Sequence, residues 1–196
     1  NENSDIWNKE VTIKASERVI VDAKSGKGKS TFIQTLYGIR QDYRGEVLFN
    51  GKKLQEHSKN ELAVLRKSKM SIVFQDLRLF HELSARDNML IKTVQGEAPH
   101  DFTIDDLANR LNITHLLNRK ANLLSYGERQ RVATIRSLMQ SFDWIMLDEP
   151  FSHLDEENTL ASFHLIKEIA DLNNAGILIT TLGKDPFIDF ERTLKL

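Results

Sequence analysis

The chain has 196 residues, of which 40% are hydrophobic, and 27 basic against 28 acidic residues give a net charge of −1. A dedicated nucleic-acid-binding protein usually has a strong basic excess, so no nucleic-acid partner is expected. The chain has no cysteine, which excludes disulfides, zinc–thiolate sites and cysteine nucleophiles. Its length suits one sizeable domain, or one domain with an inserted lobe. No apolar run is long enough to cross a bilayer and no signal peptide is expected, although a chain without an initial methionine can be a piece of a longer polypeptide.

The first half of the chain alternates between strand and helix patterns. In chain order, the sequence predicts a strand at 11–14, a strand at 18–21, a helix at 31–37, a strand at 45–51, a short helix at 61–67 and a strand at 70–74. The segments 18–21 and 70–74 are the β-branched runs typical of buried strands. The segment 45–51 ends in an Asn-Gly pair, which indicates a tight turn.

The second half begins with a helical region and returns to the strand–helix alternation. Helices are predicted at 85–93, 104–111, 113–117 and 127–141, with a loop-like break at 95–100. A strand at 143–147, a long amphipathic helix at 157–172 and a strand at 176–181 follow. Strands that alternate with helices on both sides of a helical insertion predict an α/β fold with a parallel sheet.

A glycine-containing loop lies between the strand at 18–21 and the helix at 31–37, and we expect it to bind phosphate. Glycines let several backbone N–H groups converge on phosphate oxygens, and the positive end of the following helix adds attraction. The candidate nucleotide-binding residues of this loop are Lys24, Ser25, Gly26, Lys27, Gly28, Lys29, Ser30 and Thr31. Lys29 would contact the terminal phosphates and Ser30 would bind Mg²⁺. The alternative is an ordinary strand–helix turn with incidental lysines.

Two carboxylates end the strand at 143–147. Asp148 and Glu149 are expected at the carboxyl edge of the sheet, where ligands bind in such folds. Asp148 would hold Mg²⁺, and Glu149 would orient or deprotonate an attacking water. The alternative is a pair of acids that cap a helix after a core strand.

The segment Leu124–Arg131 (LSYGERQR) strongly resembles the signature motif of ATP-binding-cassette (ABC) ATPases. Gln75 stands where that family has the glutamine of its Q-loop, and residues 151–155 (FSHLD) match its D-loop. These motifs follow the order and spacing of the family, and the resemblance covers nearly the whole chain. Tyr126 departs from the motif, because a glycine usually stands at that position.

The resemblance implies one ABC ATPase domain with a P-loop NTPase fold, which has a RecA-like parallel sheet, an inserted helical subdomain and a small antiparallel β region. Its core would comprise 1–76 and 142–196, and its helical subdomain about 77–141. ATP and Mg²⁺ would be the cofactors. The resemblance implies catalytic roles for Glu149, Lys29 and Gln75, metal binding by Ser30, Gln75 and Asp148, and nucleotide contacts from Ser125, Gly127 and Glu128.

The family also pairs its cassettes head to tail. A homodimer or a paired cassette is therefore implied, with Ser125 and the backbone N–H of Gly127 meeting the γ-phosphate of ATP bound to the partner. An integral membrane permease is the second implied partner. The run 65–90 looks most like the subgroup that serves lipoprotein release, macrolide export and cell division. Leu79, Phe80 and Leu83 are candidate contacts for the permease, or core residues of the helical lobe.

Two positions break the family pattern. The family places a histidine after its last core strand, but here Leu182 or Lys184 stands there. We therefore predict slower hydrolysis than is usual for the family, or hydrolysis that depends on a partner. The aromatic residue that stacks on adenine would fall before Asn1, and Trp7 is too close to the loop to serve. Trp7 is instead expected to cover the sheet.

The leading interpretation is an ATPase subunit of an ABC transporter or a related inner-membrane complex. It would be cytoplasmic and peripheral, on the cytoplasmic face of the inner (plasma) membrane. One alternative is a soluble ABC ATPase without a transport role. Another is a regulatory cassette that binds ATP but hydrolyses it poorly, a reading that Leu182 favours and Glu149 opposes.

Overall fold

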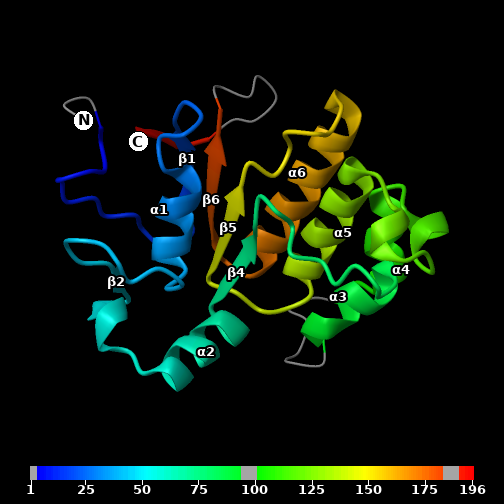
Figure 1. Ribbon diagram of the computed structural model, residues 1–196, viewed down its shortest axis with the longest axis horizontal. Coiled ribbons are helices and arrows are strands. Elements are labelled where there is room, and N and C mark those ends of the chain that lie inside the picture. Colours follow the sequence, from blue (N-terminus) through cyan, green and yellow to red (C-terminus); the bar gives the residue numbers. More distant parts are fainter. Residues whose placement is uncertain (1–3, 94–100, 183–189) are drawn as a thin grey trace.

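The computed structural model describes residues 4–93, 101–182 and 190–196. Its centre is a parallel sheet with the strand order β4-β5-β6-β1-β7 (Figure 1). The strands are β1 (Arg18–Asp22), β4 (Met70–Val73), β5 (Trp144–Asp148), β6 (Gly176–Thr181) and β7 (Arg192–Lys195). Each strand pairs in parallel with its neighbours, so the loops that follow β1, β4, β5 and β6 emerge at one edge of the sheet.

Helices connect these strands. The α-helices are α1 (Lys29–Leu36), α2 (Lys59–Ser68), α3 (Ala85–Thr93), α4 (Ile104–Arg110), α5 (Tyr126–Leu138) and α6 (Glu156–Leu172). Short 3₁₀ helices are η1 (Leu54–Glu56), η2 (Thr114–Leu116) and η3 (Ala121–Leu123). A small antiparallel hairpin joins β2 (Leu48–Phe49) and β3 (Lys52–Lys53). Capping boxes fix the starts of α2, α4 and α5, and their N-cap residues are Ser58, Thr103 and Ser125 respectively.

The two faces of the sheet are covered by different helices. Side chains alternate along each strand, so Val19 and Val21 of β1 face one way and Ile20 the other. The face with Val19 packs against Phe32 and Ile33 of α1. The face with Ile20 belongs to the larger apolar cluster, which includes buried residues of α3, α4, α5 and α6. In Figure 1 α1 accordingly lies on one side of the strands and α5 and α6 on the other.

Most predicted elements are confirmed, with shifts of a few residues at their ends. The strand predicted at 11–14 is wrong, because this segment has no ladder partner in the described chain. Val11 and Ile13 are half-buried against the α1-side cluster, so the alternating pattern reflects packing of an extended segment. The predicted helix at 113–117 is the 3₁₀ helix η2. The break predicted at 95–100 lies outside the described residues.

The predicted α/β fold and small antiparallel region are confirmed. The division of the chain into a core and a helical subdomain, with boundaries near residues 77 and 141, stays a prediction. Helices α3 to α5 lie at one end of the molecule (Figure 1), yet they share one buried cluster with the sheet. Within the described ranges, no helix has both the length and the apolar content needed to span a bilayer.

Candidate functional site

The glycine loop connects the end of β1 to the start of α1. Gly26 and Gly28 have φ angles of +75° and +95°, which side chains other than glycine rarely adopt. Gly28 is the N-cap of α1, and in this described helix no side chain caps the first turn and no acid lies in it. The first N–H groups of a helix have no intrahelical partner. They are therefore available here for an anion, as predicted for a phosphate loop.

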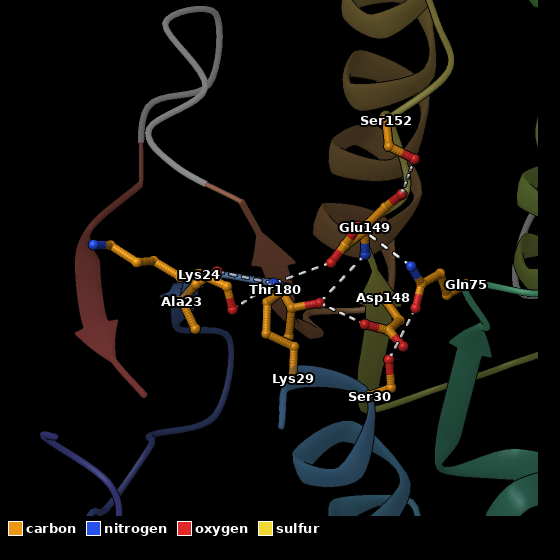
Figure 2. A network of polar contacts seen from close by, with 9 residues as sticks. All are labelled: Ala23, Lys24, Lys29, Ser30, Gln75, Asp148, Glu149, Ser152 and Thr180. Carbon is orange, nitrogen blue, oxygen red and sulfur yellow. Dashed lines mark hydrogen bonds and ion pairs between the residues drawn. The ribbon is translucent and has the colours of Figure 1, made fainter. Parts of the chain in front are cut away.

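Lys29 is folded back over this loop. Its Nζ donates hydrogen bonds to the carbonyls of Ala23, at 2.8 Å, and Lys24, at 3.3 Å. Nζ also pairs with Oε1 of Glu149 at 3.1 Å, and the two side chains are only 4% and 11% exposed. Figure 2 shows this lysine between the loop and the end of β5. The structure thus brings together the predicted phosphate-binding cation and the predicted catalytic carboxylate.

Gln75 joins Ser30 to the same carboxylate. The Oγ of Ser30 donates to Oε1 of Gln75 at 3.1 Å, and Nε2 of Gln75 donates to Oε2 of Glu149 at 3.4 Å (Figure 2). Asp148 is 3% exposed and accepts a bond from the Oγ1 of Thr180 at 2.8 Å. Loops that follow β1, β4 and β5 therefore meet at the edge of the sheet that the strand pattern predicts.

The backbone of Glu149 is held in an unusual conformation. Its φ is +50°, a left-handed value that costs a non-glycine residue about 1–3 kcal/mol. Its carbonyl accepts bonds from Nε2 of Gln130 and Oγ of Ser152, each at 3.2 Å, and its N–H donates to the carbonyl of Thr180 at 3.2 Å. These bonds fix the direction in which the carboxylate leaves the strand.

The donor set at this edge fits Mg²⁺. Ser30, Gln75 and Asp148 offer a hydroxyl, an amide carbonyl and a carboxylate, all hard oxygen ligands. All three line one surface cavity of about 290 Å³. No group of three His, Cys, Asp or Glu side chains suited to a metal occurs among the described residues. Mg²⁺ usually takes only one or two carboxylates, completed by phosphate and water, so the donors present are sufficient.

The signature-like segment forms a second feature, at the start of α5. Ser125 is the N-cap, and its Oγ accepts from the N–H of Glu128 at 3.3 Å while Oε2 of Glu128 accepts from the N–H of Ser125 at 2.7 Å. Accepting that backbone bond holds the pKa of the Glu128 carboxyl below its usual value. In the described chain, neither residue is hydrogen-bonded to the phosphate loop.

Gly127 and Tyr126 contact segments outside α5. A Cβ on Gly127 would lie 3.0 Å from the carbonyl oxygen of His153, so a side chain there would require the 151–155 segment to move by a few tenths of an ångström. The Tyr126 ring lies 4.1 Å from the His153 ring, centroid to centroid. Its hydroxyl donates to the backbone carbonyl of Gln75. Tyr126 is therefore half-buried against its own chain.

The other predicted site residues have varied environments. Residues 24–27 are exposed, and Oγ1 of Thr31 accepts a bond from Arg40 at 3.4 Å. Leu182 is 56% exposed, and Lys184 lies outside the described residues. Trp7 packs edge-on against Phe32 of α1, with ring centroids 6.3 Å apart, and its Cζ2 would be 3.8 Å from a Cβ on Gly28. It thus covers the phosphate loop and its helix.

Sequence reasoning missed Thr180, Gln130 and Ser152. Thr180 is fully buried in β6 and stands opposite Asp148 in the ladder between β5 and β6. A signal was available, because a threonine pair interrupts the apolar strand at 180–181. The roles of Gln130 and Ser152 depend on the position of the Glu149 carbonyl, which no sequence pattern specifies.

Comparisons with known proteins agree with this geometry. The family described as ABC transporter matches residues 7–152. The lipoprotein-releasing system ATP-binding protein LolD of Buchnera aphidicola subsp. Schizaphis graminum is 32% identical over 175 residues, which are 86% of this chain and 75% of the relative. The cell division ATP-binding protein FtsE of Bacillus subtilis is 32% identical over a match that covers 89% of this chain and 77% of the relative.

Another relative and a solved structure extend the match. The macrolide export ATP-binding/permease protein MacB of Nitrosomonas europaea is 33% identical over 87% of this chain and 26% of its own length. The dimeric post-hydrolysis structure of the cassette MJ0796, bound to ADP and Pi, has a TM-score of 0.78 and 25% identity, and covers 88% of this chain and 78% of its own. These relatives match the subgroup expected from residues 65–90. The chain is an ATP-binding, P-loop ATPase subunit that belongs to the ABC transporter family.

Proposed function

We propose that two copies of this chain, or this chain and a second cassette, pair head to tail around ATP and drive a membrane permease. The observation that carries this proposal is that Ser125 begins α5 without a hydrogen bond to the phosphate loop in the described part of the chain. Lys29, Ser30, Gln75 and Glu149 form one bonded group. Ser125 is the N-cap of a different helix, and its described hydrogen bonds are to Glu128 and Arg129 of that helix. The dimeric structure of MJ0796 supports the same arrangement.

Within one half-site the residues have distinct roles. The loop N–H groups and Lys29 bind the phosphates, and Ser30, Gln75 and Asp148 would hold Mg²⁺. Bound Mg²⁺ supplies positive charge to the phosphate oxygens during transfer. Glu149 orients or deprotonates the attacking water, and the backbone bonds that fix its φ keep its carboxylate aimed at that water. Ser125 and the N–H of Gly127 contact the γ-phosphate bound to the partner cassette.

The permease is proposed to dock on an exposed apolar surface beside α3. Phe80 is 57% exposed, Leu83 38% and Leu123 62%. The segments that carry them lie side by side, because the N–H of Ala121 donates to the carbonyl of Leu83 at 2.9 Å. Leu79, the other sequence candidate, is 8% exposed and belongs to the core. With the permease bound to this surface, the chain would lie at the cytoplasmic face of the inner membrane.

Hydrolysis is proposed to be slow for the family. Leu182 follows β6 directly, and its exposed side chain can neither accept nor donate a hydrogen bond. A Leu182→His variant should therefore raise kcat, by about 10-fold or more if the imidazole takes part in proton transfer. Turnover that is already usual for the family, and unchanged in Lys184→Ala, would contradict this part of the proposal.

Mass measurements in solution test the head-to-tail pairing. Glu149→Gln should be monomeric with MgADP and dimeric with MgATP, because blocked hydrolysis retains the ATP that joins the two copies. Adding Ser125→Arg should abolish the dimer, whereas Ala63→Arg on the exposed surface of α2 adds the same charge elsewhere and should not. A dimer that survives Ser125→Arg would rule out pairing through the start of α5.

Turnover measurements test the permease. ATP turnover should rise when the candidate membrane partner is present in vesicles. Phe80→Ser and Leu83→Ser should remove that rise and leave the basal turnover unchanged. Leu172→Ser provides the control, because Leu172 is 60% exposed at the end of α6. An equal loss in the control variant would show that the Phe80 surface is not the docking site.

A further inference from the structure

Tyr126, the first residue of α5, contacts two segments that belong to other parts of the site. Its hydroxyl donates a hydrogen bond to the backbone carbonyl of Gln75. Its ring lies 4.1 Å from the His153 ring at an interplanar angle of 44°. The guanidinium carbon of Arg129 lies 5.5 Å from the centre of the same ring. One side chain therefore connects the start of α5, the segment after β4 and the 151–155 segment.

The position of the Gln75 backbone determines whether its carboxamide can contact both neighbours. Its bond from Ser30 is 3.1 Å long and its bond to Glu149 is 3.4 Å long, close to the limit beyond which a hydrogen bond is lost. A shift of a few tenths of an ångström in the backbone would break the longer bond. Gln75 follows the end of β4 at Val73, so the sheet ladder does not hold it. The Tyr126 hydroxyl supplies the missing anchor.

The Tyr126 hydroxyl keeps the proton that this bond requires. A tyrosine hydroxyl is a hydrogen-bond donor at neutral pH. The ring is held on one side by His153, whose Nδ1 is 2.9 Å from the Oγ of Ser152. Phenylalanine could keep the ring contacts but could not make the bond to Gln75.

We propose that Tyr126 is a positioning residue that sets the Gln75 carboxamide between Ser30 and Glu149 from the start of the signature helix. The inference rests on the proposed function in one respect, the role of Gln75 as a ligand of Mg²⁺. A consequence follows for the pair of cassettes. The signature motif contacts the nucleotide of the partner, and Gln75 contacts the nucleotide of its own chain. Tyr126 couples the two, which a glycine at this position could not do.

Metal and nucleotide binding, measured separately, test this role. The affinity for Mn²⁺ is measured in the presence of ATP by electron paramagnetic resonance, and the affinity for ATP is measured in EDTA. Tyr126→Phe should weaken Mn²⁺ binding by about 3- to 10-fold, the range that a single hydrogen bond contributes. It should leave ATP affinity in EDTA unchanged. Gln75→Ala should weaken Mn²⁺ binding at least as much.

Two control variants distinguish the effect of losing the Tyr126 hydroxyl from the effect of disturbing its ring and from the effect of removing any tyrosine hydroxyl. Tyr43→Phe removes the hydroxyl of a half-exposed tyrosine outside the site and should change neither affinity. His153→Ala removes the stacked ring but keeps the Tyr126 hydroxyl, so its effect on Mn²⁺ binding should be smaller than that of Tyr126→Phe.

The outcomes are distinguishable. Mn²⁺ binding that Gln75→Ala weakens and Tyr126→Phe does not would overturn the inference and leave the proposed function intact. Mn²⁺ binding that neither variant changes would contradict the metal role of Gln75, and the inference about Tyr126 would fail with it. Equal losses of Mn²⁺ affinity, ATP affinity and thermal stability in Tyr126→Phe would mean that the tyrosine only stabilises the fold, which also overturns the inference.

Discussion

The pair between Lys29 and Glu149 predicts that Glu149→Gln will lose stability and gain ATP affinity by the same amount. The Lys29 ammonium is buried and pairs with the carboxylate at 3.1 Å. Breaking a buried pair costs about 3–5 kcal/mol when a charge is left uncompensated. Here the ammonium keeps the carbonyls of Ala23 and Lys24. The free energy of unfolding without nucleotide should therefore fall by the smaller value of a charged hydrogen bond, about 2 kcal/mol.

In wild-type protein, phosphate must compete with Glu149 for Lys29, whereas in the variant it does not. If the pair is lost in the ATP complex, the thermodynamic cycle requires about 2 kcal/mol tighter binding, or roughly 30-fold. The melting temperature of the free variant should fall by about 4–8 °C, and saturating MgATP should remove most of that difference. Calorimetric titration and thermal melts measure both quantities.

Turnover should fall by about 10²- to 10⁴-fold in the same variant, because the amide cannot accept a proton from water. Glu10→Gln is the control, since it removes the same charge from an exposed residue and should change neither property. A Glu149→Gln variant that is as stable as wild type and binds ATP no more tightly would show that the Lys29–Glu149 pair neither stabilises the free protein nor competes with phosphate. Retained turnover would instead refute the catalytic role of Glu149.

ATP binding should change the fluorescence of Trp7, because its ring lies beside Gly28 and Phe32. The chain has two tryptophans. The Trp7→Phe variant should abolish the fluorescence change, whereas Trp144→Phe should keep it. Gly176→Ala should lower the free energy of unfolding by about 1–3 kcal/mol, because its Cβ would lie 2.4 Å from the Trp144 ring; denaturant melts that match wild type would contradict this contact. The folded protein holds the pKa of Glu128 below its ordinary value of 4.5. The ionised carboxylate therefore contributes its full stabilisation at pH values above 4.5, and this contribution is lost as the pH falls through the lowered pKa. Glu128→Gln, which can keep the capping box, should lose less stability than wild type between pH 6 and about 3.5, and equal losses in thermal melts would count against a titrating cap.

Much of the fold could be predicted because its strands are buried on both faces. Such strands appear in the sequence as short β-branched runs, as at 18–21 and 176–181. The sequence does not predict the edge strand β7, since Arg192–Lys195 has alternating exposure and, among the described strands, pairs with β1 alone. The error at 11–14 has a related cause, because alternation indicates which side chains are covered and cannot show whether a strand partner exists.

The candidate site likewise has a part that the sequence predicts and a part that it does not. The sequence predicts that Lys29, Ser30, Gln75, Asp148 and Glu149 meet at one edge of the sheet, because each occupies a fixed place in a motif or at the end of a strand, and the structure brings them together. The contacts between motifs could not be predicted. Thr180 contacts Asp148 across the ladder, and the path from Tyr126 to Gln75 depends on how α5 sits beside the end of β4. Such contacts arise from packing between segments far apart in the chain.

The close approach at Gly127 affects how mutations in the signature motif should be interpreted. Its missing Cβ would meet the carbonyl of His153, a residue of the same chain. A side chain at this position would therefore require the 151–155 segment to move by a few tenths of an ångström, even in a single cassette. Loss of activity in Gly127→Ala can therefore follow from a displaced 151–155 segment alone. To attribute the defect to a contact across the interface, the folding stability of the isolated monomer must be compared with its ability to dimerise.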